Sequence, residues 1–117
     1  MALTVLIVDD DRSFRSLARI LLTARGYTVI GEAEGVDDGL AVATEIRPDA
    51  ALVDVNLRDG DGLELAARLT REGGPRVLLT SSDATAAPER LVRRCGAVGF
   101  VAKEDLARSA LDTYLTR

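Results

Sequence analysis

Histidine is absent from this 117-residue chain, and cysteine occurs only once, at Cys95. Without histidine the chain cannot form a histidine-based catalytic triad or a histidine-ligated metal site, so any metal would be held by oxygen ligands. Oxygen ligands favour Mg²⁺, Mn²⁺ or Ca²⁺. A single cysteine cannot form an internal disulfide, and it gives no indication of an oxidising compartment.

Aromatic residues, long apolar runs and basic tracts are also scarce. Only 3% of the residues are aromatic against 47% hydrophobic, so aliphatic side chains must fill the core. The longest apolar runs, such as residues 3–8, are far too short to span a bilayer, and the N-terminus lacks the basic flank and apolar stretch of a secretory signal. The net charge of −4 argues against direct nucleic-acid binding. We therefore expect a cytoplasmic domain that contacts neither membrane nor nucleic acid.

Short apolar runs alternate regularly with helical patterns. Five such units predict one α/β domain over residues 1–117, with helices on both faces of a parallel sheet. In the first helix Phe14, Leu17, Ala18 and Leu21 are predicted to form the buried face. Strands are predicted at 3–8, 27–33, 50–53, 76–79 and 99–102, and helices at about 12–25, 36–46, 61–71, 88–95 and 105–116.

Polar side chains follow four of these predicted strands. Ligands of an open parallel sheet bind at the carboxyl ends of its strands, where the strand order reverses. The side chains therefore converge if the first, third, fourth and fifth strands are neighbours. In chain order they are Asp9, Asp10, Asp11, Asp54, Thr80, Ser81 and Lys103.

Asp9, Asp10 and Asp54 would then form a cluster of carboxylates at the edge of an apolar core. Repulsion would raise their pKa values unless a positive charge joined them. Mg²⁺ suits such a cluster, because it binds through one or two carboxylates and takes a phosphate oxygen as a further ligand. The alternative interpretation is helix capping, since Asp is favoured at helix starts, and it fits Asp11 best.

Asp54 at a strand end, beside a bound cation, can attack phosphorus and form an acyl phosphate. The ammonium of Lys103 can pair with one phosphoryl oxygen, and the hydroxyl of Thr80 can donate to another. The small Ser81 beside Thr80 would leave the site open. The set of residues therefore favours phosphoryl transfer to a carboxylate.

The motifs together resemble the receiver domains of bacterial two-component response regulators, over essentially the whole chain. The resemblance implies a flavodoxin-like (βα)5 three-layer sandwich whose five-stranded parallel sheet has the order 2-1-3-4-5. It rests on Val8-Asp9-Asp10, Asp54 with the turn Asp61-Gly62, Leu79-Thr80-Ser81, and Gly96-Ala97 with Gly99-Phe100 and Lys103.

The resemblance also implies a role for each site residue. Asp54 would be the phosphoacceptor, assisted by Thr80 and Lys103. The metal would be Mg²⁺, with Mn²⁺ as a substitute, and its protein ligands would be Asp10 directly, Asp9 through water, Asp54, and the backbone carbonyl of Asn56.

A switch and its partners follow from the same resemblance. Thr80 would move towards the phosphoryl group, and the ring of Phe100 would turn inward into the vacated space. The donor would be a phosphohistidine on a sensor histidine kinase or histidine phosphotransfer protein. The fourth helix, fifth strand and fifth helix would contact an output domain or a second copy. Such a domain is a signalling switch rather than an enzyme, and it can form the N-terminal part of a longer regulator.

Two positions depart from the family pattern. Glu104 follows Lys103 where the family often has a cis proline, and Arg58 stands where proline often occurs four residues after Asp54. A non-proline cis bond costs about 3–4 kcal/mol, so we expect a trans bond after Lys103.

Two other functions stay open. The chain can be a pseudo-receiver, an interaction module with this fold but without phosphotransfer. Alternatively, Asp9-Asp10-Asp11 resembles the start of haloacid-dehalogenase-type phosphatases, in which Asp9 would be the nucleophile, although the later acidic pair usual in that family has no counterpart here.

Overall fold

In the computed structural model, which describes residues 2–71 and 73–116, five strands form one parallel sheet in the order β2-β1-β3-β6-β7. Counted within this sheet the order is 2-1-3-4-5, so the flavodoxin-like topology is confirmed. The strands are β1 Thr4–Val8, β2 Thr28–Ala33, β3 Ala50–Asp54, β6 Arg76–Ser81 and β7 Gly99–Ala102. A separate antiparallel pair, which we did not predict, joins β4 Asn56–Leu57 to β5 Gly60–Asp61.

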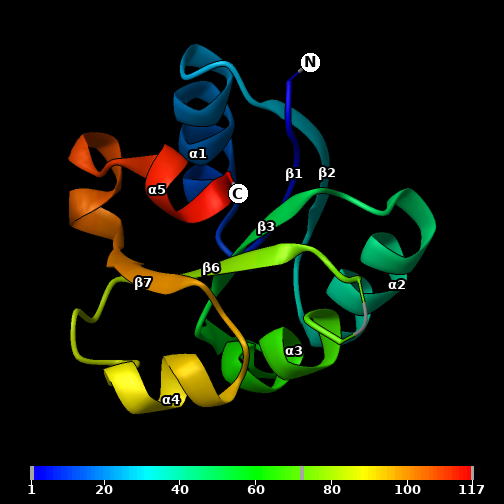
Figure 1. Cartoon of the computed structure of the whole chain (residues 1–117), viewed down its shortest axis with the longest axis vertical. Helices are drawn as coiled ribbons and strands as arrows, with labels where there is room; N and C mark the ends of the chain where they lie inside the picture. The colour runs from blue at the N-terminus through cyan, green and yellow to red at the C-terminus, as the bar shows by residue number, and fades with distance from the viewer. Residues whose placement is uncertain (1, 72, 117) are drawn as a thin grey trace.

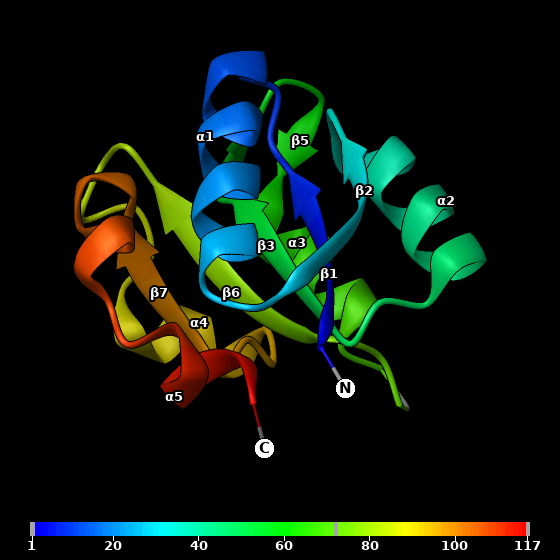
Figure 2. The same cartoon turned by 90° about the horizontal axis from the view of Figure 1, so that it is seen from above.

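Helices cover both faces of the sheet, as the alternating pattern predicts (Figures 1 and 2). α1 and the C-terminal helices pack on one face, and α2, α3 and α4 pack on the other. The helices are α1 Arg12–Ala24, α2 Val36–Ile46, α3 Gly62–Leu69, α4 Glu89–Arg94, the 3₁₀ helix η1 Lys103–Arg108 and α5 Leu111–Leu115. Within the described ranges, no helix has the length and apolarity to cross a membrane.

Side chains that alternate along each strand divide the core into two layers. Val5 and Ile7 of β1 belong to the layer under α1 and α5, and Leu6 and Val8 belong to the layer under α2 and α3. All four are fully buried. β1 lies inside the sheet with helices on both faces, and this explains its unbroken run of apolar residues.

Asp11 caps the start of α1. Its Oδ1 accepts hydrogen bonds from the backbone N–H groups of Ser13 and Phe14, at 2.9 and 3.4 Å. These contacts satisfy donors that have no partner within the helix, so the capping interpretation of Asp11 is confirmed. Just beyond the helix, Gly26 has a φ of +92°, a conformation that favours glycine.

The prediction that Leu17 is buried is wrong, because its side chain is 62% exposed. The face of α1 that meets the sheet is centred on Ala18, with Arg15 and Leu22 beside it. At 3.6 residues per turn, Leu17 lies well off the centre of this face. The buried face is therefore rotated from the predicted one, with Arg15 on it and Leu17 outside it.

The prediction of one continuous helix over residues 105–116 is also wrong. η1 and α5 are separated at Ser109, whose backbone is extended with φ −79° and ψ 155°. Leu106 and Leu111 are both buried although they are five residues apart. A continuous α-helix would direct them to different faces, so the break allows both to contact the core.

Tyr27 connects the start of β2 to the C-terminal helix, because its hydroxyl donates a hydrogen bond to the carboxylate of Asp112. Burial, together with this hydrogen bond, raises the pKa of Tyr27 to about 12. An unfolded tyrosine ionises near pH 10. Between these values the unfolded chain loses a proton that the folded chain keeps, so ionisation of Tyr27 favours unfolding.

We expect the free energy of unfolding to fall by about 1 kcal/mol per pH unit between pH 10 and 12 because of Tyr27. Urea denaturation of the wild type and Tyr27→Phe at pH 8, 10 and 11 measures this. The Phe variant should be less stable at pH 8 and lose less stability on going to pH 11. An equal loss in both proteins would contradict the assignment.

Candidate functional site

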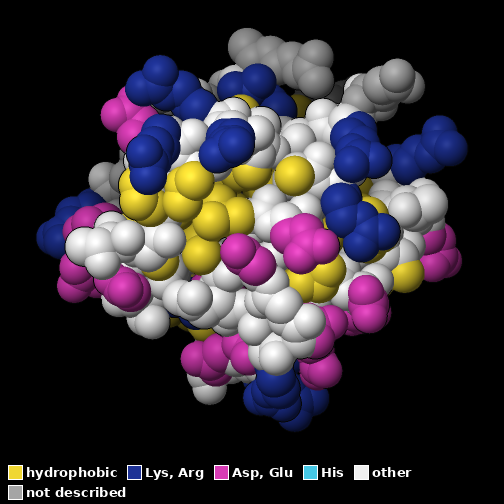
Figure 3. Space-filling view, turned by 90° about the horizontal axis from the view of Figure 1, so that it is seen from below, with side chains coloured by type: hydrophobic (Ala, Val, Ile, Leu, Met, Phe, Trp, Pro, Cys, Tyr) yellow, Lys and Arg dark blue, Asp and Glu magenta, His cyan; other side chains and the backbone are white. Residues whose placement is uncertain are grey.

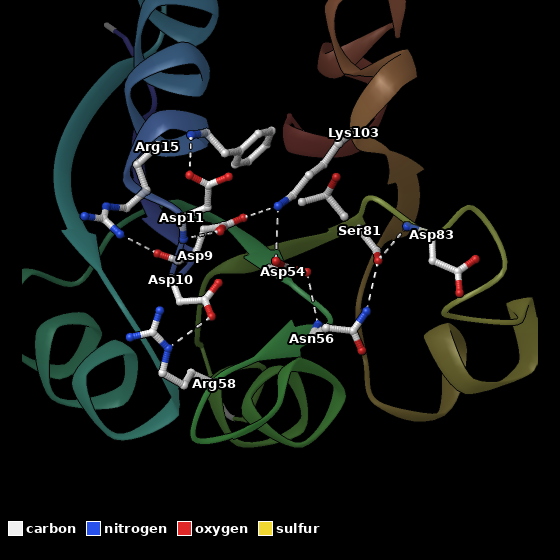
Figure 4. A network of polar contacts seen from close by, with 12 residues as sticks. Asp9, Asp10, Asp11, Arg15, Asp54, Asn56, Arg58, Ser81, Asp83 and Lys103 are labelled. Carbon is white, nitrogen blue, oxygen red and sulfur yellow. Dashed lines mark hydrogen bonds and ion pairs between the residues drawn. The ribbon is translucent and has the colours of Figure 1, made fainter.

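Charged residues from three strand ends meet at the carboxyl edge of the sheet, where the sequence predicts a site (Figure 4). Asp9 and Asp10 follow β1, Asp54 ends β3, and Lys103 directly follows β7. The ammonium nitrogen of Lys103 lies 2.8 Å from Oδ2 of Asp9 and 3.2 Å from Oδ2 of Asp54. The predicted convergence of these residues is therefore present in the structure.

Burial makes the pairing between Lys103 and the two acids necessary. Asp9 is fully buried, and Asp54 is 5% exposed. Burial raises the pKa of Asp9, since it penalises the charged carboxylate. Burial also works against the charged form of Lys103, but its contacts with Asp9 and Asp54 prevail and raise the pKa of the amine. Lys103 also lies 4.2 Å from the centre of the Phe14 ring, a distance at which the ring face attracts a cation.

Asp9, Asp10 and Asp54 each offer a carboxylate oxygen, and these oxygens lie within 4.8 Å of one another. Apart from its ion pair with Lys103, the buried Oδ2 of Asp9 has no hydrogen-bond partner among the described residues. A close set of oxygen donors with excess negative charge fits a hard divalent cation such as Mg²⁺ or Mn²⁺. Asp10 is half-buried, so the cluster is open to solvent on that side.

Two hydrogen bonds hold the backbone that follows Asp54. The N–H of Asn56 donates to Oδ1 of Asp54 at 3.0 Å, and the N–H of Gly62 donates to the carbonyl of Val55 at 2.8 Å. A Cβ atom at Gly62 would lie only 2.0 Å from the carbonyl oxygen of Asp54. The first turn of α3 can therefore approach this strand end only because position 62 has no side chain.

Thr80 and Ser81 lie within β6, whereas the sequence pattern placed both after the end of the strand. Thr80 pairs with Asp54 across the sheet, but its fully buried hydroxyl donates to the carbonyl of Val101, at 2.7 Å. Ser81 is buried, and its hydroxyl accepts hydrogen bonds from the Asn56 side chain at 3.1 Å and the Asp83 N–H at 3.0 Å. Ser81 thus connects two loops at the rim of the site.

The hairpin after Asp54 carries two charged side chains in different roles. Arg58 is exposed, and its Nε lies 3.8 Å from Oδ2 of Asp10, a weak surface ion pair. Asp59 accepts hydrogen bonds from the N–H groups of Val36 and Asp37 at the start of α2. The contact with Val36 is the main reason that the pKa of Asp59 is lowered. Asp59 thereby caps α2 from another part of the chain.

The predicted switch residue Phe100 is half-buried and packs against the core layer under α2, α3 and α4. It pairs with Leu79 on β6, next to the pair formed by Thr80 and Val101. The peptide bond between Lys103 and Glu104 is trans, as expected, and so are the other bonds in the described ranges.

Arg15, which the motifs of the sequence did not single out, is buried and donates to the backbone carbonyl of Asp9 at 2.6 Å. The available signal was its position, three residues before Ala18 and seven before Leu22 on the apolar face of α1. A charged residue in such a stripe requires a partner. Glu32 on β2 provides one, at 2.9 Å from Nε of Arg15.

Known proteins are similar to this chain over most of its length. The family model described as response regulator receiver domain matches residues 5–115. The positive transcription regulator of virulence factors BvgA from Bordetella pertussis is 40% identical over 105 residues, which is 86% of this chain and 49% of BvgA. The response regulator GacA from Pseudomonas aeruginosa is 34% identical over 102 residues, which is 85% of this chain and 47% of GacA. The chain spans about half the length of these curated relatives.

Solved structures show the same arrangement of helices and strands. The crystal structure of a two-component response regulator of the LuxR family from Aurantimonas sp. SI85-9A1 is similar with a TM-score of 0.86. That protein is 25% identical in sequence, and the match covers 98% of this chain and 86% of that one.

Substituting Gly62 tests whether the site depends on the close approach of position 62 to the carbonyl oxygen of Asp54. Gly62→Ala should destabilise the protein by at least about 2 kcal/mol, since a Cβ atom would collide with the Asp54 carbonyl. Chemical denaturation measures the change. Gly73→Ala serves as the comparison, because a Cβ atom at position 73 would meet open space. It should destabilise the protein less than Gly62→Ala, by the backbone strain that alanine has at a φ of +73°. Equal stability of Gly62→Ala and the wild type would contradict the argument.

Proposed function

This chain belongs to the response regulator receiver family, and from this premise we propose that it accepts a phosphoryl group on Asp54. The donor is a phosphohistidine on a sensor histidine kinase or a histidine phosphotransfer protein. The observation that carries the proposal is the grouping of Asp9, Asp10 and Lys103 around the carboxylate of Asp54. Asp9 shares the ammonium and the acidic neighbours of Asp54, so the assignment of the acceptor between these two carboxylates is what the labelling experiment below tests.

In the proposed transfer a carboxylate oxygen of Asp54 forms a bond to phosphorus. The bond between phosphorus and the donor imidazole nitrogen breaks, and its electron pair returns to the ring. Mg²⁺ or Mn²⁺, held by Asp9, Asp10, Asp54 and the Asn56 carbonyl, would supply positive charge to the phosphoryl oxygens. Lys103 already lies 3.2 Å from Oδ2 of Asp54, so its ammonium can pair with a further phosphoryl oxygen after a small movement.

Thr80 carries the proposed link between phosphorylation and the rest of the domain. Its hydroxyl now donates to the carbonyl of Val101, the residue after Phe100. A phosphoryl oxygen on Asp54 would be a stronger, charged acceptor. We propose that Thr80 exchanges acceptors, that β7 is thereby released beside Phe100, and that the ring then turns inward. Phosphorylation in this scheme shifts the populations of two states of one surface.

The surface that changes is proposed to be the face of α4, β7 and α5. Seen from the side of α3 and α4, hydrophobic side chains gather in a patch with basic side chains along one side and acidic side chains on others (Figure 3). On α4 the residues Arg90, Arg93 and Arg94 are exposed. An output domain or a second copy of the chain is the proposed partner, and the relatives that include transcription regulators extend well beyond the part that this chain matches.

Incubation with a small acyl phosphate and Mg²⁺ tests the proposed phosphoacceptor. The wild type should gain one phosphoryl group, and Asp54→Asn should reduce the initial rate by at least about 100-fold, as measured by intact-protein mass spectrometry. Asp11→Asn is the matched control, because asparagine caps helices about as well as aspartate. Label lost only in Asp9→Asn would indicate phosphatase-type chemistry instead. Absence of both labelling and a Mg²⁺-dependent response to beryllium fluoride would favour an interaction module.

Substituting Thr80 tests the link to Phe100. Beryllium fluoride with Mg²⁺ should shift the ring resonances of Phe100 in the wild type and in Thr80→Ser, which keeps the hydroxyl. Thr80→Val should bind the anion but lose most of the shift, and it should cost about 1–3 kcal/mol because the Val101 carbonyl loses its donor. The chain has two phenylalanines, which simplifies assignment. An undiminished shift in Thr80→Val would contradict the coupling.

A further inference from the structure

Arg15 is the buried cation that the proposed chemistry does not use. Arg15 is 8% exposed, and it lies on the face of α1 that packs against the sheet. Burying a guanidinium costs several kcal/mol unless charged and hydrogen-bonding partners compensate for the lost water. The structure provides such partners in Glu32, at 2.9 Å from Nε, and in the Asp9 carbonyl, at 2.6 Å from Nη1.

The contact with Asp9 involves its backbone rather than its carboxylate. The accepting oxygen belongs to the peptide group between Asp9 and Asp10, and that group is planar. A charge-assisted hydrogen bond to this oxygen therefore restrains the orientation of the segment that carries both acids. Figure 4 shows Arg15 on the side of this segment away from Lys103, so the two cations hold Asp9 from opposite directions.

The guanidinium is itself held in place. Glu32 accepts from Arg15 with Oε1 and from Arg19 with Oε2, at 2.9 Å each. These hydrogen bonds lower the pKa of Glu32 although its burial opposes this, so the carboxylate stays charged. Arg19 is more exposed than Arg15. Its other hydrogen bond goes to the carbonyl of Val29, which is not part of the acidic site.

We infer that Arg15 is a positioning residue for the acidic site, through its hydrogen bond to the carbonyl of Asp9. It maintains the arrangement in which Asp9 and Asp10 converge on Asp54, and so it increases the affinity for a divalent cation that it does not touch. The inference rests on the proposed function only in taking these three acids as the cation site.

Electrostatics alone makes the opposite prediction. A positive charge near a cation site repels the cation, so removing that charge should tighten Mg²⁺ binding if Arg15 acted only as a charge. If Arg15 acts by position, removing it should weaken binding, as happens when groups that orient metal ligands are lost. Arg15→Lys separates the two further, because an ammonium keeps the charge but cannot reproduce the planar fork that bonds Glu32 and the carbonyl together.

The test is a Mg²⁺ titration of the whole chain, followed by isothermal calorimetry and by the amide resonances of Asp10 and Asp11. Arg15→Gln should raise the Kd for Mg²⁺ by about 10-fold or more, and Arg15→Lys by a smaller factor. Arg19→Gln is the matched control, since it removes the other partner of Glu32 without touching Asp9, and its Kd should stay within about 2-fold of the wild type.

Thermal unfolding of each variant separates stability from positioning. A Kd that stays unchanged or decreases in Arg15→Gln would overturn the inference, even if the variant is less stable. An equal loss of affinity in Arg19→Gln would also overturn it. If Arg15→Gln does not fold, Arg15→Lys decides by the same criteria. A wild type that shows no saturable response to Mg²⁺ would overturn the proposed cation site itself, a result distinct from either of these.

Discussion

The ion pairs of Lys103 with Asp9 and Asp54 are the interaction on which the site depends. They join residues from three strand ends that are far apart in the chain. Two buried carboxylates a few ångströms apart would repel each other strongly in surroundings that contain little water. An ammonium between them offsets that repulsion, and the parallel sheet is what delivers it there. The fold and the local charge balance therefore support each other.

Much of the fold and the reactive set could be predicted from the sequence because both follow from simple regularities. Buried parallel strands require unbroken apolar runs, and such runs identified β1, β3 and β6 inside the main sheet, while the alternation with helices identified the two edge strands. In the order β1-β3-β6-β7 their carboxyl ends share one edge, and the long side chain of Lys103 can reach Asp9 and Asp54 across β6. The capping role of Asp11 depended only on its neighbours along the chain, so it too could be predicted.

The details that escaped prediction depend on contacts between distant residues. The hydroxyl of Thr80 donates a hydrogen bond to the carbonyl of Val101, and nothing near Thr80 in the sequence indicates this partner. Arg15 could be recognised as buried only if Glu32 on another element was known to meet it. The break at Ser109 arises because two leucines five residues apart must reach the same core. Local propensity is weak evidence where tertiary packing decides.

The place of β7 in the sheet has a consequence for the durability of the site. β7 is an edge strand that pairs only with β6 within the described sheet, and the helices after it are short. Local opening needs the least free energy where few buried contacts must be broken. Detachment of this C-terminal portion would withdraw Lys103 while the acids stay in place on the inner strands. The domain would then briefly contain an unneutralised anionic pocket, and ambient divalent ions would compete to fill it.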